Sequence, residues 1–275
     1  MSVVNTNLHA QSAQHALAHA NRSVHQSVAE LSTGKRINSA ADDAIGLAMG
    51  NKMTSQIRSL DMAVRNANDG ISMLQTADAA TASLSDMLNR MSELAIQSAN
   101  DTNTDTNRTD LHQEFQALQS EISNVLKNTQ WNGMAVLDGG AGNAGAVQFQ
   151  VGSADDDTVS LSMTSLDTGS LATAQTLDIS TQSGANSALS TLADAATELD
   201  NSRSQWGAVS NRLLHAADNA TNVALNQSVS RSRIVDTDYA LATANLAKAQ
   251  IIEQAGTAML SQANQHAFNV LALLS

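Results

Sequence analysis

The feature that most limits the fold of this chain is a long row of apolar residues spaced three and four apart. The row begins near Met49 and continues through Leu60, Leu74 and Leu88 to Ala95. Such spacing keeps the row on one side of a helix and is typical of a coiled-coil-like seam. About fifty helical residues would extend about 75 Å. Because so long a helix needs partners along its course, we expect a mostly α-helical fold: an elongated antiparallel helical bundle or coiled coil with a small β-hairpin region.

The composition is consistent with long helices. The 275 residues include no proline, which breaks helices, and no cysteine, which excludes disulfides and thiolate metal sites. A net charge of −12 argues against a nucleic-acid partner, because binding to phosphates requires clustered lysine and arginine. We expect no membrane span, and the start of the chain shows no standard secretory signal.

Further elements follow from the local pattern. A polar stretch, "NDTNTDTNRTD", is expected to form a loop, with a helix from Asp110 to about Lys127 behind an Asp110–Gln113 capping pair. Two runs that alternate apolar and polar residues, 147–151 and 159–163, predict a β-hairpin. The helical pattern returns near Asn186, is interrupted at "RSRIVDTDYA", and continues to the end of the chain.

Both ends of the chain lack charged side chains. Residues 1–21 and 254–275 contain no Lys, Arg, Asp or Glu, although the whole chain is acidic. A buried, unpaired charge is costly, so we predict that the ends pair with each other and with neighbouring molecules in a dry environment. The apolar residues expected in this terminal assembly segment are Leu8, Leu17, Val24, Val28, Leu31, Ile252, Met259, Val270, Leu271, Leu273 and Leu274.

No pattern in the sequence predicts a catalytic, cofactor or metal site. His15 and His19 share one helix face, but no acidic residue lies nearby as a third ligand or base, so we interpret them as polar-face residues. The stretch "DTNTDTNRTDLH" begins like a calcium loop, but it has Thr106 and His112 where that loop requires glycine and glutamate. We therefore interpret this stretch as a solvated turn.

Several stretches resemble the two conserved ends of bacterial flagellin. "LSTGKRINSAADDAIGLAMGNKMTSQI", "RNANDGISMLQTADAA" and "NTQWNGMAVLDG" are similar to its amino-terminal part. "SRSRIVDTDYA", "AQIIEQAGTAMLSQANQ" and "NVLALLS" are similar to its carboxy-terminal part. The resemblance covers roughly residues 1–140 and 186–275. It leaves some 45 residues between the two parts, which suffices for the hairpin but not for an outer domain.

The resemblance implies a structural, non-enzymatic subunit that self-assembles into the flagellar filament for motility. Residues 1–40 and 236–275 would form the coiled-coil inner tube, and residues 41–235 a rod domain with the hairpin at about 145–180. The subunit would be secreted by type III export and lie in the extracellular filament. Its partners would be itself, an export chaperone, and the cap and hook-junction proteins.

The resemblance also implies contacts with innate immune receptors. Toll-like receptor 5 and neighbouring subunits would use a rod surface formed by Arg90, Glu93, Leu94, Gln97 and Glu114. Cytosolic flagellin sensors would bind the terminal segment around Val270 and Leu274.

Two alternatives differ from a filament subunit. The first is a hook–filament junction protein of the same superfamily, which would share weaker terminal similarity. The second is a metal-dependent enzyme that uses His15 and His19, which a measurement of bound metal would reveal.

Overall fold

The computed structural model describes residues 6–143 and 145–272, and the side chains up to residue 265. The chain divides into two compact units, which are described separately. The terminal unit comprises Met1–Ser55 and Asn226–Ser275, and the central unit comprises Gln56–Leu225. The predicted fold class is confirmed: the described residues form six α-helices and two small antiparallel strand pairs.

The long apolar row predicted from the sequence forms the centre of helix α2, Ala44–Ala99. All eleven members of the row from Leu60 to Ala95 are part-buried or buried, and Ala67, Ala77, Leu84 and Met91 are 0% exposed. The first members are less covered, since Met49 is 46% exposed and Met53 is half-buried. The row is therefore a true core seam only within the central unit.

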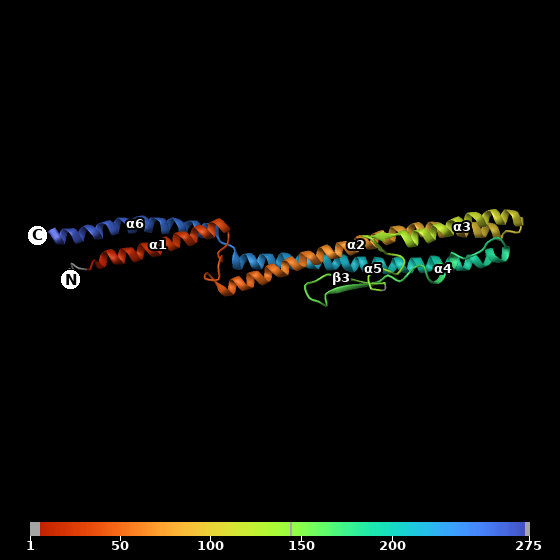
Figure 1. Cartoon of the computed structure of the whole chain (residues 1–275), viewed down its shortest axis with the longest axis horizontal. Coiled ribbons are helices and arrows are strands. Elements are labelled where there is room, and N and C mark those ends of the chain that lie inside the picture. Colours follow the sequence, from red (N-terminus) through yellow and green to blue (C-terminus); the bar gives the residue numbers. More distant parts are fainter. Residues whose placement is uncertain (1–5, 144, 273–275) are drawn as a thin grey trace. The chain divides into compact units, whose positions relative to one another are not determined.

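Three helices of the central unit share one core. Helix α2 packs with α3, Asp105–Asn128, and with α5, Gln182–Val235 (Figure 1). Phe115, Ile122 and Leu126 of α3 are completely buried, as are Ala185, Ala195 and Leu213 of α5. An ion pair of 2.8 Å between Arg203 Nε and Asp78 Oδ1 joins α5 to α2 beside this core.

Helix α3 begins earlier than the sequence pattern predicts. Thr104 is its N-cap, and its side chain accepts a hydrogen bond from the backbone N–H of Asn107. The predicted Asp110–Gln113 cap is therefore wrong, and half of the expected polar loop is helical. Arg108 explains the difference: this side chain is 6% exposed and donates to the carbonyls of Ser98 and Asn100 at the end of α2. A buried cation at a helix C-terminus is favoured by the helix dipole.

The expected β-hairpin is present at the predicted position. Strand β3, Ala146–Gln150, pairs antiparallel with β4, Thr158–Ser162, and Phe149 lies opposite Val159. Asn66 of α2 donates to the carbonyl of Gln150 at 3.1 Å. A Cβ atom on Gly70 would lie 2.9 Å from the Phe149 ring, so glycine at this position lets the hairpin approach α2 closely.

The remaining short elements, β1, β2 and α4, lie in the connections between the long helices of the central unit. Strands β1, Gln130–Trp131, and β2, Met134–Ala135, are joined by Asn132 and Gly133, both with positive φ as a tight hairpin turn requires. Helix α4, Gly169–Ala174, was not expected from the sequence. The buried amide of Gln119 on α3 donates to the carbonyls of Ala174 and Leu177 and so attaches this segment to the core.

A buried charge in the core seam is expected to destabilise the central unit. Met91→Asp would place a carboxylate at a position that is 0% exposed, at a cost of about 3–5 kcal/mol for an unpaired charge. The matched control is Asn89→Asp, two residues away on the exposed side of the same helix. Thermal unfolding followed by circular dichroism should show a large loss of stability for the first variant only. Equal melting temperatures would show that the seam is not core.

Candidate assembly surface

The two ends of the described chain pair through small side chains. Helix α1, Leu8–Thr33, lies alongside α6, Tyr239–Ala272 (Figure 1). Up to residue 265, the buried residues of the pair are alanines and one serine: Ala10, Ala20, Ser27, Ala242, Ala249 and Ala263. Small residues let two helix backbones approach closely, but they remove little apolar area from water. The pair therefore gains less hydrophobic stabilisation than the core of the central unit.

A hydrogen bond joins the start of α1 to α6. Asn7 is the N-cap of α1: its side-chain oxygen accepts from the backbone N–H of Ala10 at 3.0 Å. The amide nitrogen of the same side chain donates to the carbonyl of Ala263 at 2.9 Å. One side chain thus satisfies a helix end and also sets the register of the two terminal helices.

The other end of the helix pair is held by a compact junction. Gly34 ends α1 with φ of 69°, and its carbonyl accepts from the backbone N–H of Thr237 at 3.0 Å. Arg36 donates twice to the end of α5, from its backbone to Val235 and from its guanidinium to Ile234, both at 2.7 Å. These bonds hold the short break between α5 and α6, which lies within the stretch "RSRIVDTDYA" where the sequence predicts an interruption of the helical pattern.

Aspartates begin the helices on either side of this junction. Asp43 accepts from the backbone N–H groups of Ile45 and Gly46 at the start of α2, and Asp238 accepts from Ala240 and Leu241 at the start of α6. Hydrogen bonds from the backbone N–H groups of Ser39 and then Asn38 lower the pKa of Asp42. A lowered carboxyl pKa contributes stability above the ordinary aspartate pKa, which is lost as the pH falls through the folded-state value.

Large apolar side chains that do not enter the seam stay exposed. Among the residues whose side chains the structure describes, fourteen large hydrophobic residues are exposed, and ten of these belong to the smaller terminal unit. Leu241 is 62% exposed, Ile252 45% and Met259 64%. The spacings of 11 and 18 residues from Leu241 correspond to about three and five helical turns, so the three share one side of α6. We call Leu241, Ile252 and Met259 the α6 stripe.

The residues predicted for the terminal assembly segment fall into three groups. Leu8 and Val28 of α1 and Ile252 and Met259 of α6 are exposed. Leu17, Val24 and Leu31 are half-buried on α1. The side chains of Val270, Leu271, Leu273 and Leu274 lie outside the described residues. Sequence reasoning missed Leu241 and Ile251, although the adjacent isoleucines of "AQIIEQAG" could have indicated that one of them faces away from the seam.

The predicted rod surface requires one correction. Arg90 forms ion pairs with Glu114 at 2.8 Å and Glu93 at 2.9 Å, and all three side chains are about half exposed or more. Hydrogen bonds to Glu114 and then to Glu93 raise the pKa of Arg90. Leu94, however, is 1% exposed and belongs to the core of the central unit. It therefore cannot serve as an exposed apolar anchor, because its helical position faces α3 and α5 instead of solvent.

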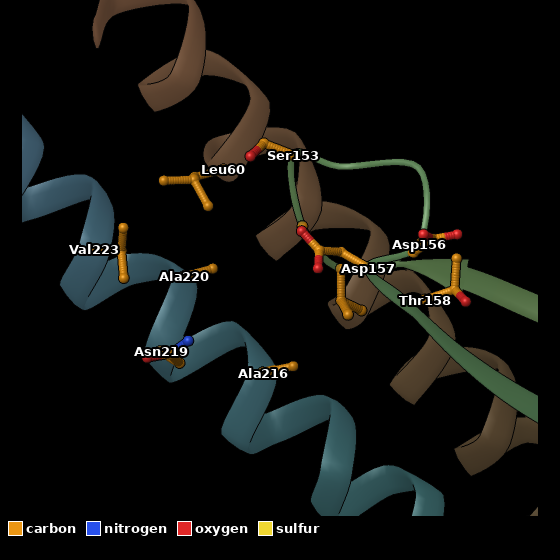
Figure 2. A pocket seen from close by; sticks show the side chains of 11 residues that line it. Leu60, Ser153, Asp156, Asp157, Thr158, Ala216, Asn219, Ala220 and Val223 are labelled. Atoms are coloured by element: carbon orange, nitrogen blue, oxygen red, sulfur yellow. The ribbon is translucent and has the colours of Figure 1, made fainter.

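A cavity of about 500 Å³ lies under the hairpin turn in the central unit (Figure 2). Leu60 of α2 and Ala216, Ala220 and Val223 of α5 line one side, and the turn from Val151 to Thr158 lines the other. The Asp157 carboxylate already accepts from the backbone N–H of Ala154. The residues that line the cavity include no histidine, lysine, arginine or cysteine.

Among the described residues, no helix is both long enough and apolar enough to cross a bilayer.

These observations define a class of protein: a helical subunit with a well-packed central unit and terminal helices whose apolar surface is only partly covered. Residues 4–142 match the bacterial flagellin N-terminal helical region, and residues 189–274 match the bacterial flagellin C-terminal helical region. The chain belongs to the bacterial flagellin family, whose members are structural subunits of the flagellar filament.

Individual relatives match along nearly their whole length. A flagellin of Halalkalibacterium halodurans is 38% identical over 273 residues, which cover 99% of this chain and 99% of that protein. Flagellin A of Vibrio cholerae is 31% identical over 377 aligned positions, covering 98% of this chain and 99% of that protein. A solved structure described as a flagellar hook-associated protein from Vibrio parahaemolyticus shares the fold, with a TM-score of 0.60 and 16% identity over 71% of this chain and 100% of that one.

The chain is a short member of the family. The two family matches leave residues 143–188 between them. Within the described part of this interval the structure contains the β3–β4 hairpin, α4 and the start of α5, and no outer domain.

Enlarging the seam between α1 and α6 is expected to separate the two helices. Ala249→Leu would introduce three carbon atoms at a position that is 6% exposed, and overpacking of this kind costs about 1–3 kcal/mol. The control is Gln250→Leu, which adds an apolar side chain at the neighbouring exposed position. Hydrogen exchange should show faster exchange in α1 and α6 for Ala249→Leu alone. Unchanged exchange in that variant would contradict a close-packed seam.

Proposed function

We propose that this chain polymerises into the flagellar filament through its terminal unit, and that the α6 stripe is part of the contact between subunits. The observation that supports this proposal is the concentration of exposed apolar side chains on the terminal unit. A second copy that covered the stripe would gain about 1.5–3 kcal/mol for each fully buried side chain. Residues 254–265 contain no Lys, Arg, Asp or Glu, so the part of such a contact around Met259 would be free of unpaired ions.

The proposal assigns a layer of the filament to each part of the chain. Residues 1–40 and 236–275 would form the coiled-coil inner tube, and residues 41–235 the surrounding rod with the hairpin. The compact units of the single chain divide instead near residues 55 and 226. The layer boundaries belong to the assembled state and stay a prediction.

We infer a structural and not a catalytic role for the chain, in keeping with its family. The subunit would leave the cell unfolded through the flagellar type III apparatus and function outside it. An export chaperone would hold the segment around Leu271 and Leu274, and the cap and hook-junction proteins would bind at the two ends of the filament. A chain without proline would refold without slow prolyl isomerisation.

The direct test is assembly of the purified protein by salt, followed by light scattering and electron microscopy. The double variant Leu241→Asn/Ile252→Asn removes two members of the α6 stripe, both exposed in the single chain. We expect normal helix content but a critical concentration for polymerisation that rises at least about tenfold, which corresponds to about 1.4 kcal/mol. The control Gln254→Asn/Thr257→Asn changes two exposed polar residues of the same helix. Normal filaments from the stripe variant would refute the proposed contact.

A second proposal concerns recognition by Toll-like receptor 5. The charged residues Arg90, Glu93 and Glu114, with Gln97, are exposed on the central unit and available to a receptor. We expect Arg90→Glu to weaken the response of receptor-bearing cells to monomer by at least about tenfold, because it reverses the charge between two carboxylates. Arg212→Glu, at another exposed arginine of the same unit, is the control. Equal responses to both variants would argue against this surface.

The same surface is proposed to contact a neighbouring subunit in the filament. Cross-linked filaments should therefore stimulate the receptor less than an equal mass of monomer. Filaments as active as monomer would show that assembly leaves the surface open.

A further inference from the structure

Helix α1 carries a concentration of histidine that its role in assembly does not explain. Four of the seven histidines of the chain lie between positions 9 and 25. All four are exposed on α1, and no other ionisable side chain occurs among the described residues before Arg22. Histidine is the commonest metal ligand among protein side chains. The question is whether any two of these imidazoles are placed to act together.

Only one pair among the four has the required spacing. His15 and His19 are four residues apart and lie within continuous helix, so their Cβ atoms lie one above the other about 5–6 Å apart. Metal-binding helices use this i, i+4 arrangement of histidines. His9 and His25 have no histidine three or four residues away.

The environment of the pair leaves the imidazoles free to bind. Ala10, Ala20 and Ser27 mark the side of α1 that packs on α6, whereas both histidines are exposed away from that seam. Neither imidazole forms a hydrogen bond or ion pair with another described residue. Arg22, three residues beyond His19, is the nearest charged residue on α1.

We propose that His15 and His19 form a two-ligand clamp for a divalent transition metal ion of the Zn²⁺, Ni²⁺ or Cu²⁺ class. Imidazole nitrogen is a suitable ligand for these ions, and the affinity of a nitrogen site is highest for Cu²⁺. No group of three or more His, Cys, Asp and Glu side chains that could hold a metal occurs in the described part of the chain. Two protein ligands therefore bind the ion, and water completes its coordination.

The clamp couples metal binding to the structure of α1. The second imidazole is held near the first only while the turn between them is helical, so it binds as if at high effective concentration. By linkage, an ion that binds the helical form must stabilise that form. The ion would thus stabilise α1, whose small-residue seam with α6 provides little hydrophobic stabilisation. This role is binding and stabilisation, and it requires no catalytic base.

The test is titration of the full-length monomer with Zn²⁺ by isothermal calorimetry, with hydrogen exchange of α1 as a second measurement. We expect one Zn²⁺ per chain at the pair and slower exchange across residues 12–22 when it is bound. His15→Gln/His19→Gln should abolish both effects. His9→Gln/His25→Gln, which removes as many histidines from the same helix, should keep both.

A third variant separates spacing from histidine content. Ala16→His/His19→Gln has the native number of histidines, but the two adjacent imidazoles point about 100° apart around the helix. We expect its affinity for Zn²⁺ to fall at least about tenfold. Circular dichroism of each variant without metal confirms that α1 is still folded. Equal loss of binding in both double glutamine variants, or native affinity in the respaced variant, would overturn the clamp.

Discussion

The close contact between α1 and α6 is the constraint that determines which apolar side chains of the terminal unit stay exposed. The described residues that are buried in this contact are alanines and a serine, so the two backbones can lie near each other while larger side chains such as Leu241 stay on the surface. Leu241, Ile252 and Met259 consequently remain on the surface. A pair of helices joined in this way is specific in register, because Asn7 bonds to Ala263, but it leaves much apolar area exposed. On the proposal above, a second subunit would bury that area when the filament forms.

The central unit, in contrast, buries large apolar side chains in a core of its own. Its seam contains Leu, Met, Ile and Phe side chains that are completely buried among α2, α3 and α5. The hairpin, α4 and the buried Gln119 and Arg108 cover the remaining sides and satisfy carbonyl groups at the helix ends. This unit therefore has its own core, whereas the terminal unit has a seam without one. The difference explains how one chain can hold a folded part and keep another part available for assembly.

The junction beyond Gly34 links the ends of three helices by short backbone bonds. Arg36 reaches two carbonyls at the end of α5, and Asp43 and Asp238 begin the helices that follow. These residues lie within the ranges that match the two bacterial flagellin regions. Their roles in the single chain are local and physical: they end one helix, begin the next and satisfy groups that would otherwise lack partners.

The sequence alone determined the long helices, the hairpin and the family, because apolar periodicity and strand alternation are local properties that a chain displays in order. It also showed that the ends lack charge. Tertiary structure decided what periodicity cannot: Leu94 is core because α3 and α5 happen to cover that side of α2, and α3 begins at Asp105 because Arg108 reaches the end of α2. It likewise decided that Leu241 faces solvent while Ala242, the next residue, enters the seam. A helical pattern shows which residues share a side, but only a partner helix determines which of those sides is buried.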